Sequence, residues 1–371
     1  MIEAKTEVEL ATAVKSANGP LRIRGGGTRD YGRPVRGEVI STLKLSGITL
    51  YEPGALTIVA QTGTPLVDIE NELARNSQRL AFEPMDHRAL LGQDGNPTIG
   101  GVIAANVSGP RRISVGAARD FLLGVRFVDG NGEIIKNGGR VMKNVTGYDL
   151  VKLMAGSYGT LGILTEVSLK VMPAHETAAT IVLNGLDVER AVAAMSSALG
   201  SPYDVTGAAH ITASRHTALR IEGFEKSVAY RTDKLTQHLG AFGKAEVISG
   251  EAHDLLWQDV RDAKALTNAD GDIWRVSVKP SDGPAVVQAV NPTSYIMDWG
   301  GGLIWMETQS GTDIRSLIHG IAGHSTLIKS SAATRSEIAS FQPEPKPLAL
   351  ISNKLRSKFD PRGILNPGLM S

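Results

Sequence analysis

The chain has 371 residues, of which 42% are hydrophobic and 21% charged, and its formal net charge is +1. This length allows two or three hydrophobic cores, and the balanced charge offers no electrostatic basis for nucleic-acid binding. The chain has no cysteine, which excludes disulfides, thiol catalysis and iron–sulfur clusters held by this polypeptide. No run approaches the roughly 20 apolar residues of a membrane span, and the polar N-terminus is unlike a secretory signal, so we expect a cytoplasmic protein.

The first half of the chain predicts short strands and helices in alternation. A helix is expected over residues 5–18, because Thr6 and Glu9 have the spacing of a capping box. The turn residues 129–132 lie between two strand-like stretches, 125–128 and 133–136. This arrangement predicts a hairpin. Further strands are expected over 21–24, 39–45, 48–51, 56–61 and 162–172, and helices over 64–75 and 145–154.

A domain boundary is expected at Pro173, beyond which the glycine density falls. The following residues, 174–341, predict a smaller α+β domain, and 342–371 a C-terminal segment with a proline-rich extended start (342–348). Helices are expected there over 186–199, 226–240, 251–265, 312–322 and 349–359.

Three glycine-rich segments are the candidate binding elements. They are Arg24-Gly25-Gly26-Gly27-Thr28, the run from Thr98 to Gly109, and the run from Gly156 to Thr165. Consecutive glycines can turn successive N–H groups toward an anion, and the missing Cβ atoms leave room for a phosphate or a flat ring. Each segment alone is also explained by ordinary turns, and no G-x-G-x-x-G opens a helix after the first strand. The residues alone therefore indicate an α+β protein that binds a phosphate or a dinucleotide.

Longer motifs carry a resemblance to a known family. They are Ser108-Gly109-Pro110-Arg111-Arg112, Arg119 to Gly124, Val141-Met142-Lys143-Asn144-Val145-Thr146-Gly147-Tyr148-Asp149-Leu150, Gly156 to Gly162, and Leu365-Asn366-Pro367-Gly368. With these motifs the chain resembles the FAD-binding family of vanillyl-alcohol oxidase and p-cresol methylhydroxylase (PCMH). Within it, the chain is most similar to the family of FAD-binding E subunits of bacterial glycolate oxidase (glycolate dehydrogenase).

This resemblance implies a fold and a cofactor site. The implied fold is α+β: a two-subdomain PCMH-type FAD-binding domain over residues 1–173, a cap domain over 174–341, and a C-terminal segment (342–371) that returns to the FAD domain. FAD is expected to be noncovalent, because Thr28 follows the first glycines where several relatives carry a tethering histidine, and no cysteine is available. The residues implied to bind FAD are Arg24, Gly25, Gly26, Gly27, Thr28, Gly100, Gly101, Ala105, Asn106, Ser108, Gly159, Gly162, Ile163 and Asn366.

The resemblance also implies the oxidation of glycolate to glyoxylate, but the catalytic residues remain unknown. Related dehydrogenases carry a histidine-rich, metal-binding signature in the second domain, and this chain has no such run, so no metal site is expected. The implied partners are therefore a paralogous FAD-containing catalytic subunit and an iron–sulfur subunit, with any membrane contact made through them. Two alternatives stay open: a self-sufficient FAD enzyme acting on a 2-hydroxy acid or a polyol, and a non-catalytic assembly scaffold.

Two further features have open interpretations. Arg111 and Arg112 are suited either to a substrate carboxylate, a flavin phosphate or a partner protein, or to a solvated loop. Trp299 and Trp305 flank three glycines in the second domain. They predict a rim over the flavin, a protein contact or an aromatic brace in the core.

Overall fold

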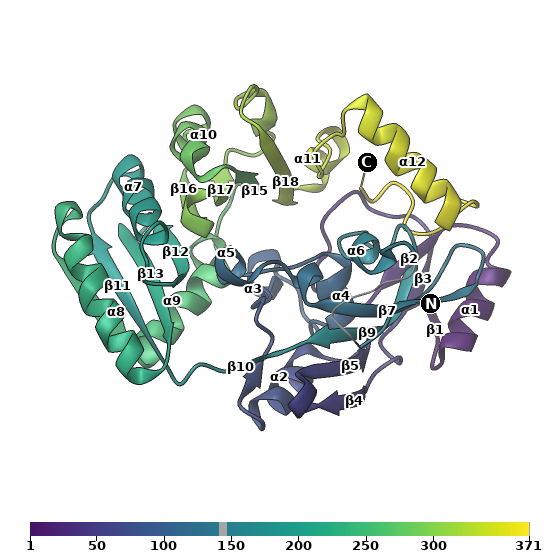
Figure 1. Ribbon diagram of the computed structural model, residues 1–371. Helices are drawn as coiled ribbons and strands as arrows, with labels where there is room; N and C mark the ends of the chain where they lie inside the picture. Colours follow the sequence, from purple (N-terminus) through teal and green to yellow (C-terminus); the bar gives the residue numbers. More distant parts are fainter. Residues whose placement is uncertain (141–146, 371) are drawn as a thin grey trace.

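The computed structural model describes residues 1–140 and 147–370. In the N-terminal region, which we define as residues 1–173, two sheets form the framework (Figure 1). A parallel sheet has the strand order β1-β3-β2, and an antiparallel sheet has the order β4-β5-β9-β7-β8. The strands of the two sheets are β1 (Ile2–Glu3), β2 (Leu21–Arg24), β3 (Glu38–Ser41), β4 (Ile48–Glu52), β5 (Thr57–Gln61), β7 (Leu122–Val128), β8 (Ile134–Gly138) and β9 (Ile163–Lys170).

Helices of this region are short, and α4 lies beside β9 and β5. They are α1 (Glu7–Ser16), α2 (Leu66–Ala74), α3 (Arg88–Leu91), α4 (Ile99–Ala104), α5 (Arg112–Val115) and α6 (Leu150–Met154). The two-residue strands β6 (Gln78–Arg79) and β10 (Met172–Pro173) pair just before the chain leaves for its second region.

The cap region, residues 174–341, is built on one antiparallel sheet with the order β14-β11-β13-β12-β16-β17-β15-β18. Its strands are β11 (Thr177–Asn184), β12 (Val205–Ile211), β13 (His216–Gly223), β14 (Ala245–Ser249), β15 (Asp272–Val278), β16 (Ser294–Asp298), β17 (Leu303–Thr308) and β18 (Gly323–Lys329). Its helices are α7 (Val188–Leu199), α8 (Glu225–His238), α9 (Glu251–Arg261), α10 (Gly283–Val290) and α11 (Ala332–Glu337). The mixed helix-and-sheet architecture confirms the expected α+β fold class.

Most of the predicted elements are present, with local differences. Thr6 caps α1 by accepting a hydrogen bond of 3.1 Å from the Glu9 backbone N–H, as the capping box predicts. The hairpin β7–β8 is also present, and the Asp129 carboxylate accepts from the backbone N–H of Glu133 at 2.8 Å. The predicted helix over 145–154 is observed as α6, whose five residues begin after Asp149.

In the second half, one predicted helix is absent and another starts earlier than predicted. Residues 312–322 contain only a 3₁₀ turn, Ile314–Ser316, because Gly311 and Gly320 hold positive φ angles at either side. The guanidinium of Arg315 binds the carbonyls of Ala339 and Phe341 and keeps this segment in place. The last helix, α12 (Lys346–Phe359), begins three residues before the expected start, since Pro347 occupies its first turn, where proline is tolerated.

The N-terminal region and the cap region share one hydrophobic core. Ile273, Ile296 and Ile328 of the cap strands are buried against the core of the N-terminal region, together with Trp299 and Trp305. The opposite face of the cap sheet has a core of its own, formed with α7 and α8. The shared core fixes how the cap lies over the N-terminal region.

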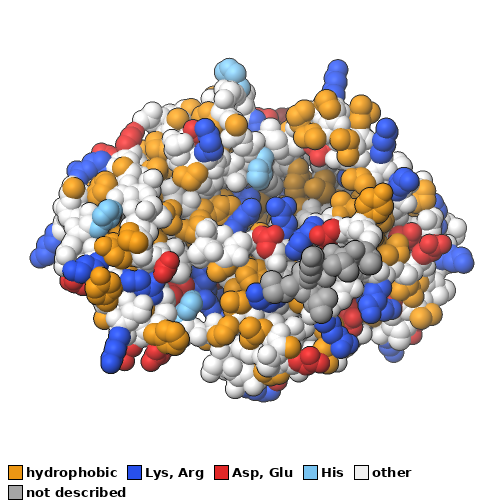
Figure 2. All heavy atoms as spheres, in the orientation of Figure 1, with side chains coloured by type: hydrophobic (Ala, Val, Ile, Leu, Met, Phe, Trp, Pro, Cys, Tyr) orange, Lys and Arg blue, Asp and Glu red, His pale blue; other side chains and the backbone are white. Residues whose placement is uncertain are grey.

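The C-terminal residues return to the first sheet. The backbone N–H of Leu21 donates to the Ile364 carbonyl at 2.7 Å, and the Asn366 N–H donates to the Leu21 carbonyl at 3.0 Å. Helix α12, which precedes this return (Figure 1), has no buried residue. It exposes Leu348 (54%), Leu350 (63%) and Ile351 (56%), and hydrophobic side chains gather in the same place in Figure 2. No helix in residues 1–140 and 147–370 is long and apolar enough to cross a bilayer.

Candidate functional site

A cavity of about 330 Å³ lies in the N-terminal region where the three glycine-rich segments meet. Twelve of the fourteen expected cofactor-binding residues line it: Arg24, Gly25, Gly26, Gly27, Thr28, Gly100, Gly101, Ala105, Gly159, Gly162, Ile163 and Asn366. These residues come from positions as far apart as 24 and 366, so the fold brings residues that are distant in the sequence to one cavity.

Two of the glycines are required because backbones pass close to each other. A Cβ atom on Gly26 would lie 1.8 Å from the Asn96 carbonyl oxygen, and one on Gly100 would lie 2.7 Å from the Thr62 carbonyl oxygen. Both distances are far below van der Waals contact. The glycines therefore let the loop after β2 and the start of α4 pack against neighbouring backbone and form adjoining walls of the cavity.

The first glycine run also has free hydrogen-bond donors. Within the described residues, the backbone N–H groups of Gly25, Gly26 and Gly27 donate to no protein acceptor. Unpaired N–H groups at the wall of a cavity need a ligand or water to accept their hydrogen bonds. Their grouping in one tight loop suits an anion such as a pyrophosphate, and they fit the cofactor expected from the sequence.

Asn366 connects the C-terminal return to the cavity wall. Its Oδ1 accepts a hydrogen bond of 2.8 Å from the Ile23 N–H, and its Nδ2 donates to the Tyr158 carbonyl at 2.9 Å. Its backbone is left-handed, with φ of 43°, a conformation that asparagine tolerates better than most residues. A Cβ atom on Gly159, the next lining residue, would lie 3.0 Å from Asn366 Nδ2.

Asn106 and Ser108 do not line the cavity, although both were expected to. The Asn106 Oδ1 accepts from the Arg119 N–H at 3.0 Å, and the Ser108 Oγ accepts from the Ala118 N–H at 2.9 Å. The chain turns away from the cavity after Ala105, where α4 ends and Asn106 takes a left-handed φ of 49°. Both side chains therefore hold the loop 117–119.

Next to the cavity lies a cluster of aromatic and basic side chains that the sequence did not indicate. Tyr158 lines the cavity, and its hydroxyl lies 3.2 Å from the Tyr31 hydroxyl. Tyr31 stacks on His87 with a centroid distance of 6.1 Å, and His87 meets Trp305 of the cap edge-on at 6.4 Å. The cluster thus runs from the cavity wall to the cap region, and Phe341 packs on Tyr158 with ring centroids 4.9 Å apart.

Two arginines in this cluster have no carboxylate partner among the described residues. Arg29, which lines the cavity, donates only a 3.4 Å hydrogen bond from Nη2 to the Met85 carbonyl. Arg275 of β15 contacts the rings of Trp299 and Trp305, with its Cζ atom 5.3 and 5.9 Å from their centroids. Burial lowers the pKa of both guanidinium groups below the ordinary value. Two desolvated cations in one cluster favour an anionic ligand.

His87 is neutral and has a free ring nitrogen. Its side chain is 4% exposed, and Nδ1 has no hydrogen-bond partner among the described residues. Burial lowers the pKa of His87 well below 6.5, and the Arg29 and Arg275 charges lower it further, although the Met85 backbone and Asp86 oppose the shift. In contrast, burial and the neighbouring Tyr31 raise the pKa of Tyr158, so that its hydroxyl stays protonated.

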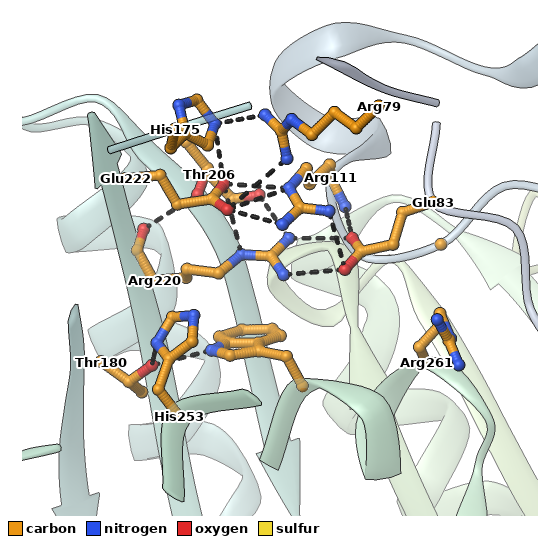
Figure 3. A network of polar contacts seen from close by, with 12 residues as sticks. Arg79, Glu83, Arg111, His175, Thr180, Thr206, Arg220, Glu222, His253 and Arg261 are labelled. Atoms are coloured by element: carbon orange, nitrogen blue, oxygen red, sulfur yellow. Dashed lines mark hydrogen bonds and ion pairs between the residues drawn. The ribbon is translucent and has the colours of Figure 1, made fainter. Parts of the chain in front are cut away.

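A buried network of ion pairs crosses from the N-terminal region to the cap (Figure 3). The Glu83 carboxylate accepts from Arg220 Nη1 and Nη2, each at 3.0 Å, and Arg111 Nη2 lies 2.6 Å from Glu222 Oε1. Arg79 Nη1 is 3.6 Å from the same Glu222 oxygen. Arg111 therefore binds two internal carboxylates, which differs from both interpretations open at the sequence level.

The tryptophans and histidines of the cap have structural contacts. Trp299 and Trp305 are 8% and 4% exposed, and the Trp299 Nε1 donates to the Gly109 carbonyl at 3.1 Å. His210 and His253 are buried beside threonine hydroxyls. In the described part of the chain, no three His, Cys, Asp or Glu side chains lie together as metal ligands. The motif residues 141–146, including Lys143 and Asn144, lie outside the described residues.

Comparison with known proteins supports the resemblance seen in the motifs. Residues 1–138 match the model of an FAD-binding domain family. Over 354 residues, which are 95% of this chain and 92% of the relative, the sequence is 34% identical to the glycolate oxidase subunit GlcE of Escherichia coli. A glycolate oxidase subunit GlcD of Bacillus subtilis is 33% identical over 49% of this chain and 38% of its own length. A D-lactate dehydrogenase of Anaerostipes hadrus is 32% identical over 52% of this chain and 40% of its own length.

A solved structure extends the likeness to the whole fold. An alkyldihydroxyacetonephosphate synthase aligns with 98% of this chain and 76% of its own, with a TM-score of 0.68 and 15% identity. This likeness concerns the fold alone. It agrees with the expected fold class of mixed helices and sheets.

Proposed function

Because the chain belongs to the FAD-binding family of the glycolate oxidase subunit GlcE, we propose that it is a subunit of a glycolate oxidase (glycolate dehydrogenase) complex. The complex would oxidise glycolate, a 2-hydroxy acid, to glyoxylate. The observation that carries this proposal is the 34% identity over 95% of the chain. FAD is the cofactor, in agreement with the expectation from the sequence.

The cavity residues would hold FAD without a covalent bond. The free N–H groups of Gly25, Gly26 and Gly27 suit the pyrophosphate, and Thr28 adds a hydroxyl at the same wall. Gly100, Gly101, Ala105, Gly159, Gly162, Ile163 and Asn366 would line the remaining surface. Bound FAD supplies a two-electron acceptor for the alcohol carbon. We retain the domain division into residues 1–173, 174–341 and 342–371 as part of the proposal.

We place the chain in a complex with two other kinds of subunit. One is a paralogous FAD-containing subunit, and the other is an iron–sulfur subunit that receives the electrons. The absence of cysteine from this chain supports the second assignment, because an iron–sulfur relay needs thiolate ligands from another polypeptide. The complex would lie in the cytoplasm, with contact to the inner face of the membrane made through the partners.

The visible spectrum of the purified chain tests the proposal. We expect flavin bands with one FAD per chain, retained on gel filtration and released by denaturation, as for a noncovalent cofactor. A chain that shows no flavin bands and takes up no added FAD would contradict the proposal and favour a scaffold. Addition of glycolate without oxygen then separates the two enzymatic alternatives. Bleaching by the chain alone indicates a self-sufficient dehydrogenase, while bleaching only after the partner subunits are added indicates an accessory FAD carrier.

The self-sufficient alternative is favoured by one observation. The cluster of Arg29, Arg275 and His87 adjoins the cavity and has cations without carboxylate partners among the described residues. A subunit that only carried FAD would have no need for unpaired buried cations where its N-terminal and cap regions meet.

A further inference from the structure

Resting on the proposed function, we propose that Arg275, Arg29 and His87 form a binding site for a 2-hydroxy carboxylate within this chain. Arg275 and Arg29 would bind the carboxylate, and His87 Nδ1 would accept a hydrogen bond from the hydroxyl. The site would lie between the cofactor cavity and the cap sheet. It would make this chain a substrate-binding subunit and more than an FAD carrier.

The position of the cluster is the first argument. Arg29 and Tyr158 belong both to the cavity wall and to the cluster, because Tyr158 contacts Tyr31 while facing the cavity. Arg275 approaches from β15 of the cap, over Trp305. A ligand among these side chains would therefore lie directly beside FAD. Figure 2 shows Lys and Arg side chains next to a hollow in the face between the cap and α12.

The second argument is the contrast with the other buried arginines. Arg111 and Arg220, which join the same two regions, each bind both Glu83 and Glu222. Arg275 has neither a hydrogen bond nor an ion pair among the described residues, and Arg29 has only its long contact to the Met85 carbonyl. A buried charge without a partner is costly, so a structural arginine would be paired as Arg220 is. An anionic ligand would supply the missing partner.

The third argument is the chemistry of the neutral groups. The His87 Nδ1 atom is buried and unpartnered, and in a neutral imidazole one ring nitrogen can accept a hydrogen bond. One of the Tyr31 and Tyr158 hydroxyls donates to the other, and the remaining hydroxyl proton adds a donor beside the cavity. Cations for a carboxylate and a neutral acceptor for a hydroxyl match the two functional groups of a 2-hydroxy acid.

Oxalate is the first probe, because it has two carboxylates and no hydrogen on carbon that FAD could remove. Calorimetric titration of the FAD-loaded chain should show one oxalate bound per chain. Arg275→Met should raise the oxalate Kd about 10- to 100-fold, as for the loss of a charged hydrogen bond, while the FAD content stays unchanged. Arg275→Lys, which keeps the charge but not the planar fork, should have a smaller effect. Arg36→Met, an exposed arginine outside the cluster, is the matched control and should bind oxalate as the native chain does.

The hydroxyl contact is tested with His87→Phe, which keeps a ring against Tyr31 and removes the acceptor. Oxalate lacks a hydroxyl donor, so its Kd should change less than about 3-fold, whereas glycolate affinity should fall about 2- to 10-fold. Glycolate is measured without oxygen. If it bleaches the flavin, the half-saturating concentration is read, and if the bands persist, the Kd comes from calorimetry.

Three results would overturn the inference. They are a native FAD-loaded chain that does not bind oxalate, an Arg275→Met variant with unchanged oxalate affinity, and an Arg275→Met variant that loses FAD. The last would assign Arg275 to the cofactor. Each outcome is distinct from failure of the proposed function, in which the native chain would carry no flavin.

Discussion

Arg220 of β13 and Glu83 of the N-terminal region face each other with both guanidinium Nη atoms 3.0 Å from the two carboxylate oxygens. Their side chains are 1% and 11% exposed. Burial raises the pKa of Glu83, but Arg220 and Arg111 lower it by more, so that its net pKa lies below the usual value. The pair is therefore charged at neutral pH, and it joins the cap to the N-terminal region.

Glu83→Gln should destabilise the protein. Removal of one partner leaves Arg220 and Arg111 with an uncompensated buried charge, and the loss should be about 3–5 kcal/mol of unfolding free energy. Urea denaturation at pH 7 measures it. The control is Glu72→Gln, which breaks an exposed pair with Arg75 on α2 and should cost about 0.3–0.5 kcal/mol. Equal losses in the two variants would show that the network does not hold the cap.

Asp298→Asn should stabilise the protein increasingly as the pH rises from 5 to 8. Burial raises the pKa of Asp298 from 3.8 to about 7, although the Trp299 N–H, 2.7 Å from its Oδ1, opposes the shift. Between these values the folded state keeps a proton that the unfolded state has lost, so the native protein loses stability with rising pH and levels off above about pH 7. The full penalty is on the order of 4 kcal/mol at pH 8.

Asparagine keeps the acceptor for the Trp299 N–H and carries no charge, so its variant avoids this penalty. Urea denaturation of both proteins at pH 5 and pH 8 gives the comparison. A difference in stability that does not change with pH would mean that Asp298 ionises as in an unfolded chain.

Gly26→Ala should weaken FAD binding and the fold together. Its Cβ would lie 1.8 Å from the Asn96 carbonyl oxygen, so the two loops must separate, at a cost of about 1–3 kcal/mol. The flavin-to-protein absorbance ratio and the Tm check this. Gly19→Ala is the control, because a Cβ there meets nothing within 4 Å. Full flavin occupancy in Gly26→Ala would show that the glycine loop is not part of the cofactor site.

Asn366→Ala should release the C-terminal return from the cavity. The substitution leaves the Ile23 N–H and the Tyr158 carbonyl without their partners, at a cost of about 1–3 kcal/mol. We expect lower FAD affinity in a fluorescence titration and faster cleavage of the C-terminal segment by a protease. Asn353→Ala, on the exposed side of α12, should leave both unchanged.

Local patterns predicted the fold better than they predicted the site. Thr6 and the turn at 129–132 act through neighbouring residues, so the sequence shows their effect directly. The prediction of a helix over 312–322 was wrong. Apolar residues at helical spacing do not form a helix where the backbone of Gly311 and Gly320 is left-handed.

The glycine runs identified the cavity, since close backbone approach restricts residue type over a short stretch. Asn106 and Ser108 were misplaced by the same reasoning, because a polar residue next to a binding loop can equally hold a neighbouring loop. Arg29 follows Thr28 directly, and its place beside the glycines was the one signal available. Arg275 had none, since it reaches the cluster through the long-range pairing of cap strands.

The return of Asn366 to β2 has a consequence for the time at which the cofactor can bind. Asn366 closes the cavity from a position 340 residues after Gly26, and the whole cap region lies between them in the chain. On a ribosome that adds residues one by one, the first glycine loop leaves the exit tunnel long before its last partner is synthesised. Stable capture of FAD must therefore wait until Asn366 has emerged, and the nascent N-terminal region has to remain without its complete cofactor site until then.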